Sequence, residues 1–151
     1  MREHPDHYDA ELLLRLYDLR REAKLRQARA WFVREFRADS ATEFFERLPP
    51  GTEENDFFSM VVSYWEMAGS IVNHGLIKEE FFFENTSEFW LVWMKIKHLA
   101  PEVRAKWKSP LVWKNLEVLA EKYEKWLARQ APEALETFRQ EVWEAARKSK
   151  A

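Results

Sequence analysis

Apolar residues recur at spacings of three and four along most of the chain, which is the period of an amphipathic α-helix. Residues 87–100 are typical, because Phe89, Trp93 and Ile96 share one face at this spacing. Tryptophans at helical spacing belong to a core more often than to a ligand platform, so we expect Trp93 to be structural. The position of Trp90 stays open, since it lies at the edge of that face.

Residues that cap or stop helices mark the boundaries between the predicted elements. With three glycines and no Asn-Gly or Asp-Gly turn, the sequence argues against a sheet. We expect a first helix from Asp6 or Asp9 and a second over residues 25–36, with a bend or break between them at residues 20–23. A short helix should follow Ser40, and Gly75 should act as a left-handed stop. Further helices are expected over residues 52–74, 78–84, 87–100, 111–129 and 133–148.

The pattern predicts an all-α fold, a compact single-domain bundle of about six to seven helices. Hydrophobic residues make up 46% of the 151 residues and aromatic residues 15%, so we expect an aromatic-rich core. The domain would span residues 1–151, with residues 1–8 as a flexible N-terminus and residues 148–151 as a frayed C-terminus.

The longest predicted helix, over residues 52–74, is apolar around most of its circumference, so we expect it at the centre of the bundle. Its polar residues form one narrow line at spacings of three and four. Two interpretations stay open: the line is a strip of solvent exposure, or it is a polar seam inside the bundle where a glutamate could act as a base or ligand. The candidate seam consists of Ser63, Glu66, Ser70, Asn73 and His74.

Charge is distributed in zones, although the net charge is only −2. Residues 20–37 hold seven basic residues against two acidic ones, a balance of +5, and residues 95–114 hold six against one, again +5. Acidic residues gather at 39–56 and 79–88, so the zones could pair within the fold or across a symmetric interface. Basic residues interleave with Trp107 and Trp113 in the second zone, as in non-specific single-strand binders. This candidate basic surface consists of Lys95, Lys97, Arg104, Lys106, Lys108 and Lys114.

The sequence contains no recognisable catalytic or metal-binding motif. The chain has no cysteine, no HExxH motif, no glycine-rich phosphate loop and no nucleophile elbow. We expect no catalytic residue, metal site or cofactor. The polar N-terminus carries no apolar signal core, and apolar runs are too short to span a bilayer, so we expect a cytoplasmic protein with no membrane partner.

Several stretches together resemble an uncharacterised bacterial family of small all-helical proteins, catalogued as a domain of unknown function. The resemblance implies a helical bundle and supplies no activity. The residues that carry it are Ala30-Trp31-Phe32, Trp65-Glu66, Gly75-Leu76-Ile77, Phe89-Trp90, Arg104 and Trp113-Lys114-Asn115-Leu116-Glu117.

Three functions remain as hypotheses. The first is a protein-interaction or structural module, possibly self-associating, which the charge zones and the aromatic excess favour. The second is a small-molecule binder or enzyme with a polar pocket around Glu66 and His74, assisted by Asn115 or Arg104. The third is a weak binder of nucleic acid or another polyanion through residues 95–114.

Overall fold

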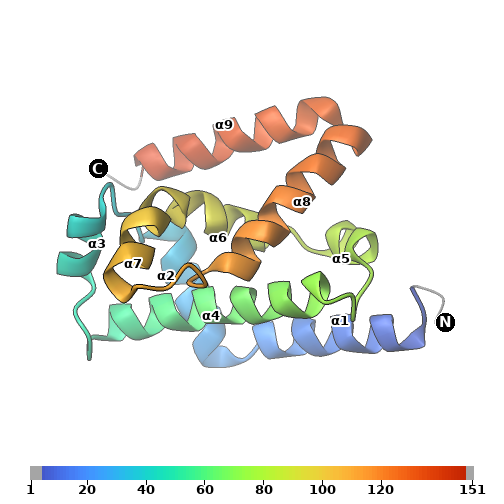
Figure 1. Ribbon diagram of the computed structural model, residues 1–151, viewed down its shortest axis with the longest axis horizontal. Helices are drawn as coiled ribbons and strands as arrows, with labels where there is room; N and C mark the ends of the chain where they lie inside the picture. Colours follow the sequence, from blue (N-terminus) through green and yellow to red (C-terminus); the bar gives the residue numbers. More distant parts are fainter. Residues whose placement is uncertain (1–4, 149–151) are drawn as a thin grey trace.

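The computed structural model describes residues 5–148, apart from the side chains of residues 143 and 145–148. Within this range the fold is all-α, as predicted (Figure 1). The helices are α1 (His7–Arg20), α2 (Ala23–Arg34), α3 (Ala41–Arg47), α4 (Glu53–Asn73), α5 (Glu79–Asn85), α6 (Glu88–Ile96), the 3₁₀ helix η1 (Lys97–Leu99), α7 (Ala100–Trp107), α8 (Lys114–Gln130) and α9 (Pro132–Lys148).

Local capping determines where the first helices begin. Asp6 and Asp9 form a reciprocal capping box at α1, and Ser40 and Thr52 cap α3 and α4 with their side-chain oxygens. Asp9 is also fully buried, and its second carboxylate oxygen accepts the Lys78 amide at 2.8 Å. The capping carboxylate of α1 therefore also fixes the start of α5.

The ends of the predicted domain are described only in part. His7 and Tyr8 lie in the first turn of α1, and Lys148 ends α9, while the flexibility of the two ends stays a prediction. Residues 1–4 and 149–151 of these two segments lie outside the described residues.

The long helix α4 lies at the centre of the bundle, as its apolar circumference predicted. It makes its most extensive contacts with α8 and α2, and α9 lies across α6 and α8 (Figure 1). Gly75 follows α4 with φ +79°, the left-handed conformation expected of the helix stop.

The core is rich in aromatic rings, and both tryptophans of α6 belong to it. Trp93 is 6% exposed and Trp90 is 3% exposed, and the Trp90 indole nitrogen donates to Glu124 at 2.9 Å. Trp113 packs edge-on to Phe44. Burial thus answers the question raised by the tryptophan spacing in α6: these rings build the interior.

Two differences from the predicted elements have clear causes. The described residues form nine α-helices, more than the six to seven expected overall, because the short segments Ala41–Arg47, Glu79–Asn85 and Ala100–Trp107 each form a separate helix. The helix predicted from residue 111 begins at Lys114, because Trp113 adopts a left-handed conformation with φ +59°. Among the described helices, none combines the length and the apolar character needed to cross a membrane.

Candidate functional site

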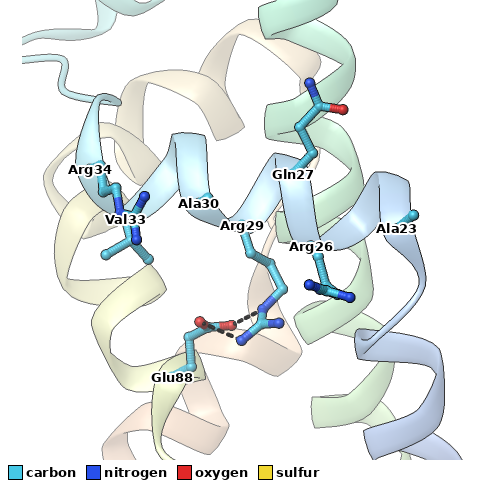
Figure 2. Close-up of a pocket in the computed structure, with 8 residues that line it drawn as sticks. All are labelled: Ala23, Arg26, Gln27, Arg29, Ala30, Val33, Arg34 and Glu88. Carbon is cyan, nitrogen blue, oxygen red and sulfur yellow. Dashed lines mark hydrogen bonds and ion pairs between the residues drawn. The ribbon is translucent and has the colours of Figure 1, made fainter.

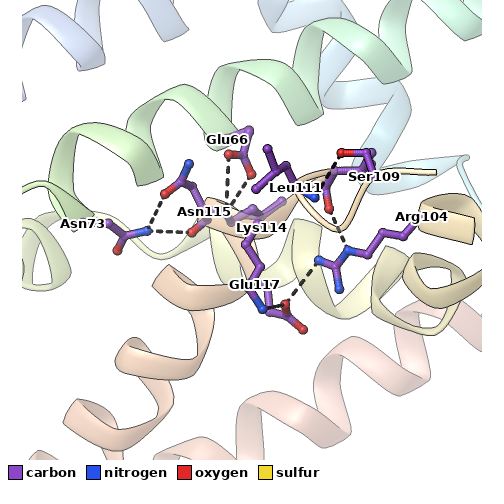
Figure 3. Close-up of polar contacts among 10 residues, drawn as sticks. Glu66, Asn73, Arg104, Ser109, Leu111, Lys114, Asn115 and Glu117 are labelled. Carbon is purple, nitrogen blue, oxygen red and sulfur yellow. Dashed lines mark hydrogen bonds and ion pairs between the residues drawn. The ribbon is translucent and has the colours of Figure 1, made fainter. Parts of the chain in front are cut away.

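The polar stripe of α4 holds the start of α8. Glu66 accepts the backbone amides of Asn115 at 3.2 Å and Leu116 at 3.0 Å (Figure 3). These amides belong to the first turn of α8, whose own N-cap residue, Trp113, makes no side-chain cap hydrogen bond. A carboxylate at this position satisfies unpaired amides and favours the positive end of the helix dipole. Glu66 therefore caps α8 from a neighbouring helix.

Asn73 and Gly69 complete this contact, which we call the α4–α8 clamp: Glu66, Gly69 and Asn73 of α4 against Asn115 of α8. The Asn73 amide nitrogen donates to the Asn115 backbone carbonyl at 3.0 Å and to its side-chain oxygen at 3.2 Å. A Cβ atom on Gly69 would lie 3.0 Å from the same carbonyl. The glycine thus allows the close approach that brings α8 within reach of Glu66.

The other residues of the candidate seam face solvent to differing degrees. Ser63 is exposed and bonds back to the Ser59 carbonyl of its own helix. His74 is exposed, and its Nδ1 lies 2.8 Å from the carbonyl of Ser70, which is half-buried. The stripe is therefore solvent-facing at Ser63 and covered by α8 at Glu66 and Asn73. A pocket around Glu66 and His74 stays a prediction, and the hollows described below are lined by neither residue.

The predicted basic surface is divided by internal contacts. Arg104 is half-buried and donates to the Val112 carbonyl at 2.8 Å and to Glu117 at 3.2 Å, and Lys114 also binds Glu117, at 2.9 Å. Burial raises the pKa of Glu117, but the Lys114 hydrogen bond and the nearby Arg104 outweigh it and hold the pKa below its usual value. These two cations serve the start of α8 (Figure 3).

The remaining four cations differ from one another in exposure and in contacts. Lys95 turns inward and donates to the Phe32 carbonyl at 2.7 Å, and burial, with a smaller effect of nearby arginines, lowers its pKa to about 8. The Lys106 ammonium lies 3.7 Å from the Phe45 ring centroid. Lys97 and Lys108 are exposed. The contacts of Lys95 and Lys106 could not be anticipated, because each partner is distant in sequence and on another helix.

The exposed face of α2 carries a groove of about 620 Å³, which Figure 2 shows. Seven of its eight lining residues come from α2, and the eighth is the first residue of α6. This α2 groove is lined by Ala23, Arg26, Gln27, Arg29, Ala30, Val33, Arg34 and Glu88.

An ion pair anchors one side of the groove. Arg29 binds Glu88 through two parallel hydrogen bonds, of 2.7 Å from Nε and 3.0 Å from Nη2. The same carboxylate accepts the Trp65 indole at 3.2 Å, and Arg29 Nη1 donates to the Arg20 carbonyl at 3.3 Å. This network joins α1, α2, α4 and α6, so the groove is built on a fixed frame.

Two arginines of the groove, Arg26 and Arg34, are exposed, whereas Arg29 is half-buried and paired with Glu88. Among the residues that the structure describes, no carboxylate pairs with Arg26 or Arg34. They lie eight residues apart, about 12 Å along the helix axis at 1.5 Å per residue. Ala23 and Ala30, two turns apart, line the groove with small side chains. The arrangement presents two available guanidinium groups beside a surface that another helix can approach closely.

The sequence indicated only part of this site. The basic excess of residues 20–37 was visible, but which arginines are paired was not, because the partner of Arg29 is 59 residues away. Arg26, Ala30 and Arg34 recur every four residues, and this spacing was the signal that could have identified the face.

The comparisons with known proteins place the chain in a family. The family model described as a domain of unknown function (DUF4760) matches residues 7–126, and the chain belongs to this family. The resemblance to an uncharacterised family is thereby confirmed. The matched segment contains the α2 groove and the α4–α8 clamp, and ends within α8. Comparison with curated proteins returned no match, and comparison with solved structures returned none either.

Proposed function

We propose that the protein is a helical interaction module that docks an acidic amphipathic helix of a partner protein in the α2 groove. The observation that supports this proposal is the pair of exposed arginines, Arg26 and Arg34, beside the alanines of a face held rigid by the Arg29–Glu88 pair. We place this role in the cytoplasm, in line with the absence of cysteine.

The spacing defines what the partner must present. Carboxylates about 12 Å apart correspond to positions seven or eight residues apart on one face of a helix. Small side chains at Ala23 and Ala30 favour an interaxial distance near 8 Å, at the lower end of the usual range. Exposed ion pairs contribute only about 0.2–1 kcal/mol each, so apolar contact with the alanines and Val33 must supply the rest. We therefore expect a transient, salt-dependent interaction.

A second copy of the chain is one source of such a segment. The first turn of α4 carries Glu53, Glu54 and Asp56, an acidic end that could meet the α2 groove of another molecule. Size-exclusion chromatography with light scattering at low and high salt identifies this case. A salt-sensitive dimer that Arg26→Glu/Arg34→Glu abolishes would make the partner another copy, and a monomer at every concentration would assign the groove to a different protein.

The test of the docking proposal compares two charge-reversal variants. Arg26→Glu/Arg34→Glu changes the groove, while Lys97→Glu/Lys108→Glu makes the same change in charge on exposed lysines elsewhere. The measurement is the affinity of each form for a purified partner protein. The wild type and the lysine variant should bind the partner equally. The groove variant should bind it at least about tenfold more weakly, a difference in binding free energy of about 1.4 kcal/mol. Equal binding by both variants would contradict the proposal.

The lysine variant also tests the polyanion hypothesis. Fluorescence anisotropy with a single-stranded oligonucleotide should show no salt-dependent binding to any form of the protein. Binding that is lost with Lys97→Glu/Lys108→Glu and retained with the groove variant would favour a nucleic-acid function over the docking module.

A further inference from the structure

A second hollow lies between α1, α4 and α5 and shares no lining residue with the α2 groove. Its volume is about 270 Å³. The walls include Leu16 of α1, Trp65 of α4 and Phe82 of α5, which are all buried, whereas Asn85 and Thr86 supply amide and hydroxyl groups. Ligand sites in proteins combine apolar walls with a few converging polar groups in this way.

The wall formed by α1 is held in place by Tyr64. Its hydroxyl donates to the Leu16 carbonyl, and burial raises the pKa of Tyr64 to about 12. The hydroxyl therefore stays protonated at neutral pH and is committed to α1. The cavity is thus a preformed feature of the packing between α1 and α4.

The cationic group of this hollow is Arg20, the last residue of α1. Its guanidinium lies 5.2 Å from the Tyr17 ring centroid and 5.6 Å from that of Trp65, and it donates to the Thr86 hydroxyl at 3.0 Å. No ion pair joins it to a carboxylate among the described residues, and Glu88 pairs with Arg29. Arginine carries five donors, and the side-chain hydrogen bond to Thr86 uses one of them.

The half-buried Arg20 guanidinium, beside an apolar cavity and with no carboxylate partner among the described residues, favours an anionic ligand. Buried charges are ordinarily paired, and a carboxylate or phosphate accepts two parallel hydrogen bonds from arginine. The volume corresponds to about nine water-sized spaces of ~30 Å³ each, which suits a ligand of about ten heavy atoms. We infer that this hollow binds a small anionic amphiphile, with its anionic head on Arg20 and Thr86 and its apolar tail against Leu16, Trp65 and Phe82.

The experiment uses the full chain and three eight-carbon probes: octanoate, octyl phosphate and octanol. Isothermal titration calorimetry should give a Kd below about 1 mM for at least one of the two anions and about tenfold weaker binding for octanol. The better anion distinguishes a carboxylate from a phosphate headgroup. In the ¹H–¹⁵N spectrum, the Trp65 indole signal, assigned with Trp65→Phe, should shift during the titration.

Two matched variants locate the site. Arg20→Gln should weaken binding of the better anion at least about tenfold, whereas Arg15→Gln, which removes an exposed charge of the same helix away from the cavity, should leave it within about twofold. Equal binding of octanol and the anions by the wild type would overturn the inference, and so would equal loss in both variants or an unchanged Trp65 signal. The headgroup comparison needs no variant, so it decides the question even if Arg20→Gln does not fold.

Discussion

Replacement of Glu66 tests whether the polar stripe of α4 caps α8. The Glu66 carboxylate accepts two amides at the start of α8, at 3.2 and 3.0 Å. Loss of an N-cap side chain destabilises proteins by about 0.5–2 kcal/mol, and loss of a charge at a helix N-terminus by about 0.3–1 kcal/mol. Glu66→Ala removes both contributions, so we expect it to lower the free energy of unfolding by about 1–3 kcal/mol.

Glu66→Gln keeps part of the cap. Its amide oxygen can accept one of the two amides, but its NH2 group cannot accept the other, so the charge and one hydrogen bond are lost and we expect a decrease of about 0.5–2 kcal/mol, smaller than in Glu66→Ala. Urea denaturation measures both variants, and each 1 kcal/mol corresponds to a fall in Tm of about 2–4 °C for a protein of this size. Hydrogen exchange at the amides of Asn115 and Leu116 should accelerate most in Glu66→Ala.

Ser63→Ala is the matched control on the same stripe. The Ser63 hydroxyl is exposed and bonds to its own helix, so its removal should change the free energy of unfolding by less than about 0.5 kcal/mol. If Glu66→Ala were no more destabilising than Ser63→Ala, and exchange at Asn115 were unchanged, the capping role of Glu66 would be refuted.

Three further changes test the packing around the site. Gly→Ala in the middle of a helix normally stabilises a protein by about 0.5–1 kcal/mol. Gly69→Ala should instead destabilise this protein, because the new Cβ would lie 3.0 Å from the Asn115 carbonyl oxygen. Increased resistance to urea would contradict the close approach of α4 and α8. The pKa of Lys95 is about 8 in the folded protein, against an ordinary value of 10.5 in the unfolded chain. Between pH 8 and 10 the unfolded state therefore binds more protons than the folded state. The free energy of unfolding should rise with pH over this range. Chemical denaturation at several pH values should show a smaller rise in Lys95→Met, and parallel curves would count against the burial of the ammonium. Trp93→Ala should lower the free energy of unfolding by about 3–5 kcal/mol, and a loss below about 1 kcal/mol would show that the ring is not a core element.

Features set by short-range interactions were predictable from the sequence. The starts of α3 and α4 depend on Ser40 and Thr52, which cap amides three residues away, so the sequence alone identified them. The same holds for the left-handed stop at Gly75 and for the burial of Trp93, which follows from helical spacing.

Features set by long-range contacts were not predictable. The start of α8 depends on Glu66, which is 49 and 50 residues away from the amides that it caps. Whether the α4 stripe faces water or protein depends on where α8 docks, and the pattern within α4 contains no information on that. For the same reason the basic zones could be counted, but Arg26, which has no carboxylate partner among residues 5–148, could not be distinguished from the paired Arg29.

The docking function of the α2 groove is tested most directly by photocrosslinking from within it. p-Benzoylphenylalanine replaces Gln27, an exposed residue that lines the groove, so that the small side chains of Ala23 and Ala30 stay in place; the same residue at position 108 is the control. We predict an adduct from position 27 with an acidic helical segment, absent from position 108 and lost when Arg26→Glu/Arg34→Glu is added. No adduct at position 27, or one that persists after this charge reversal, would contradict the account.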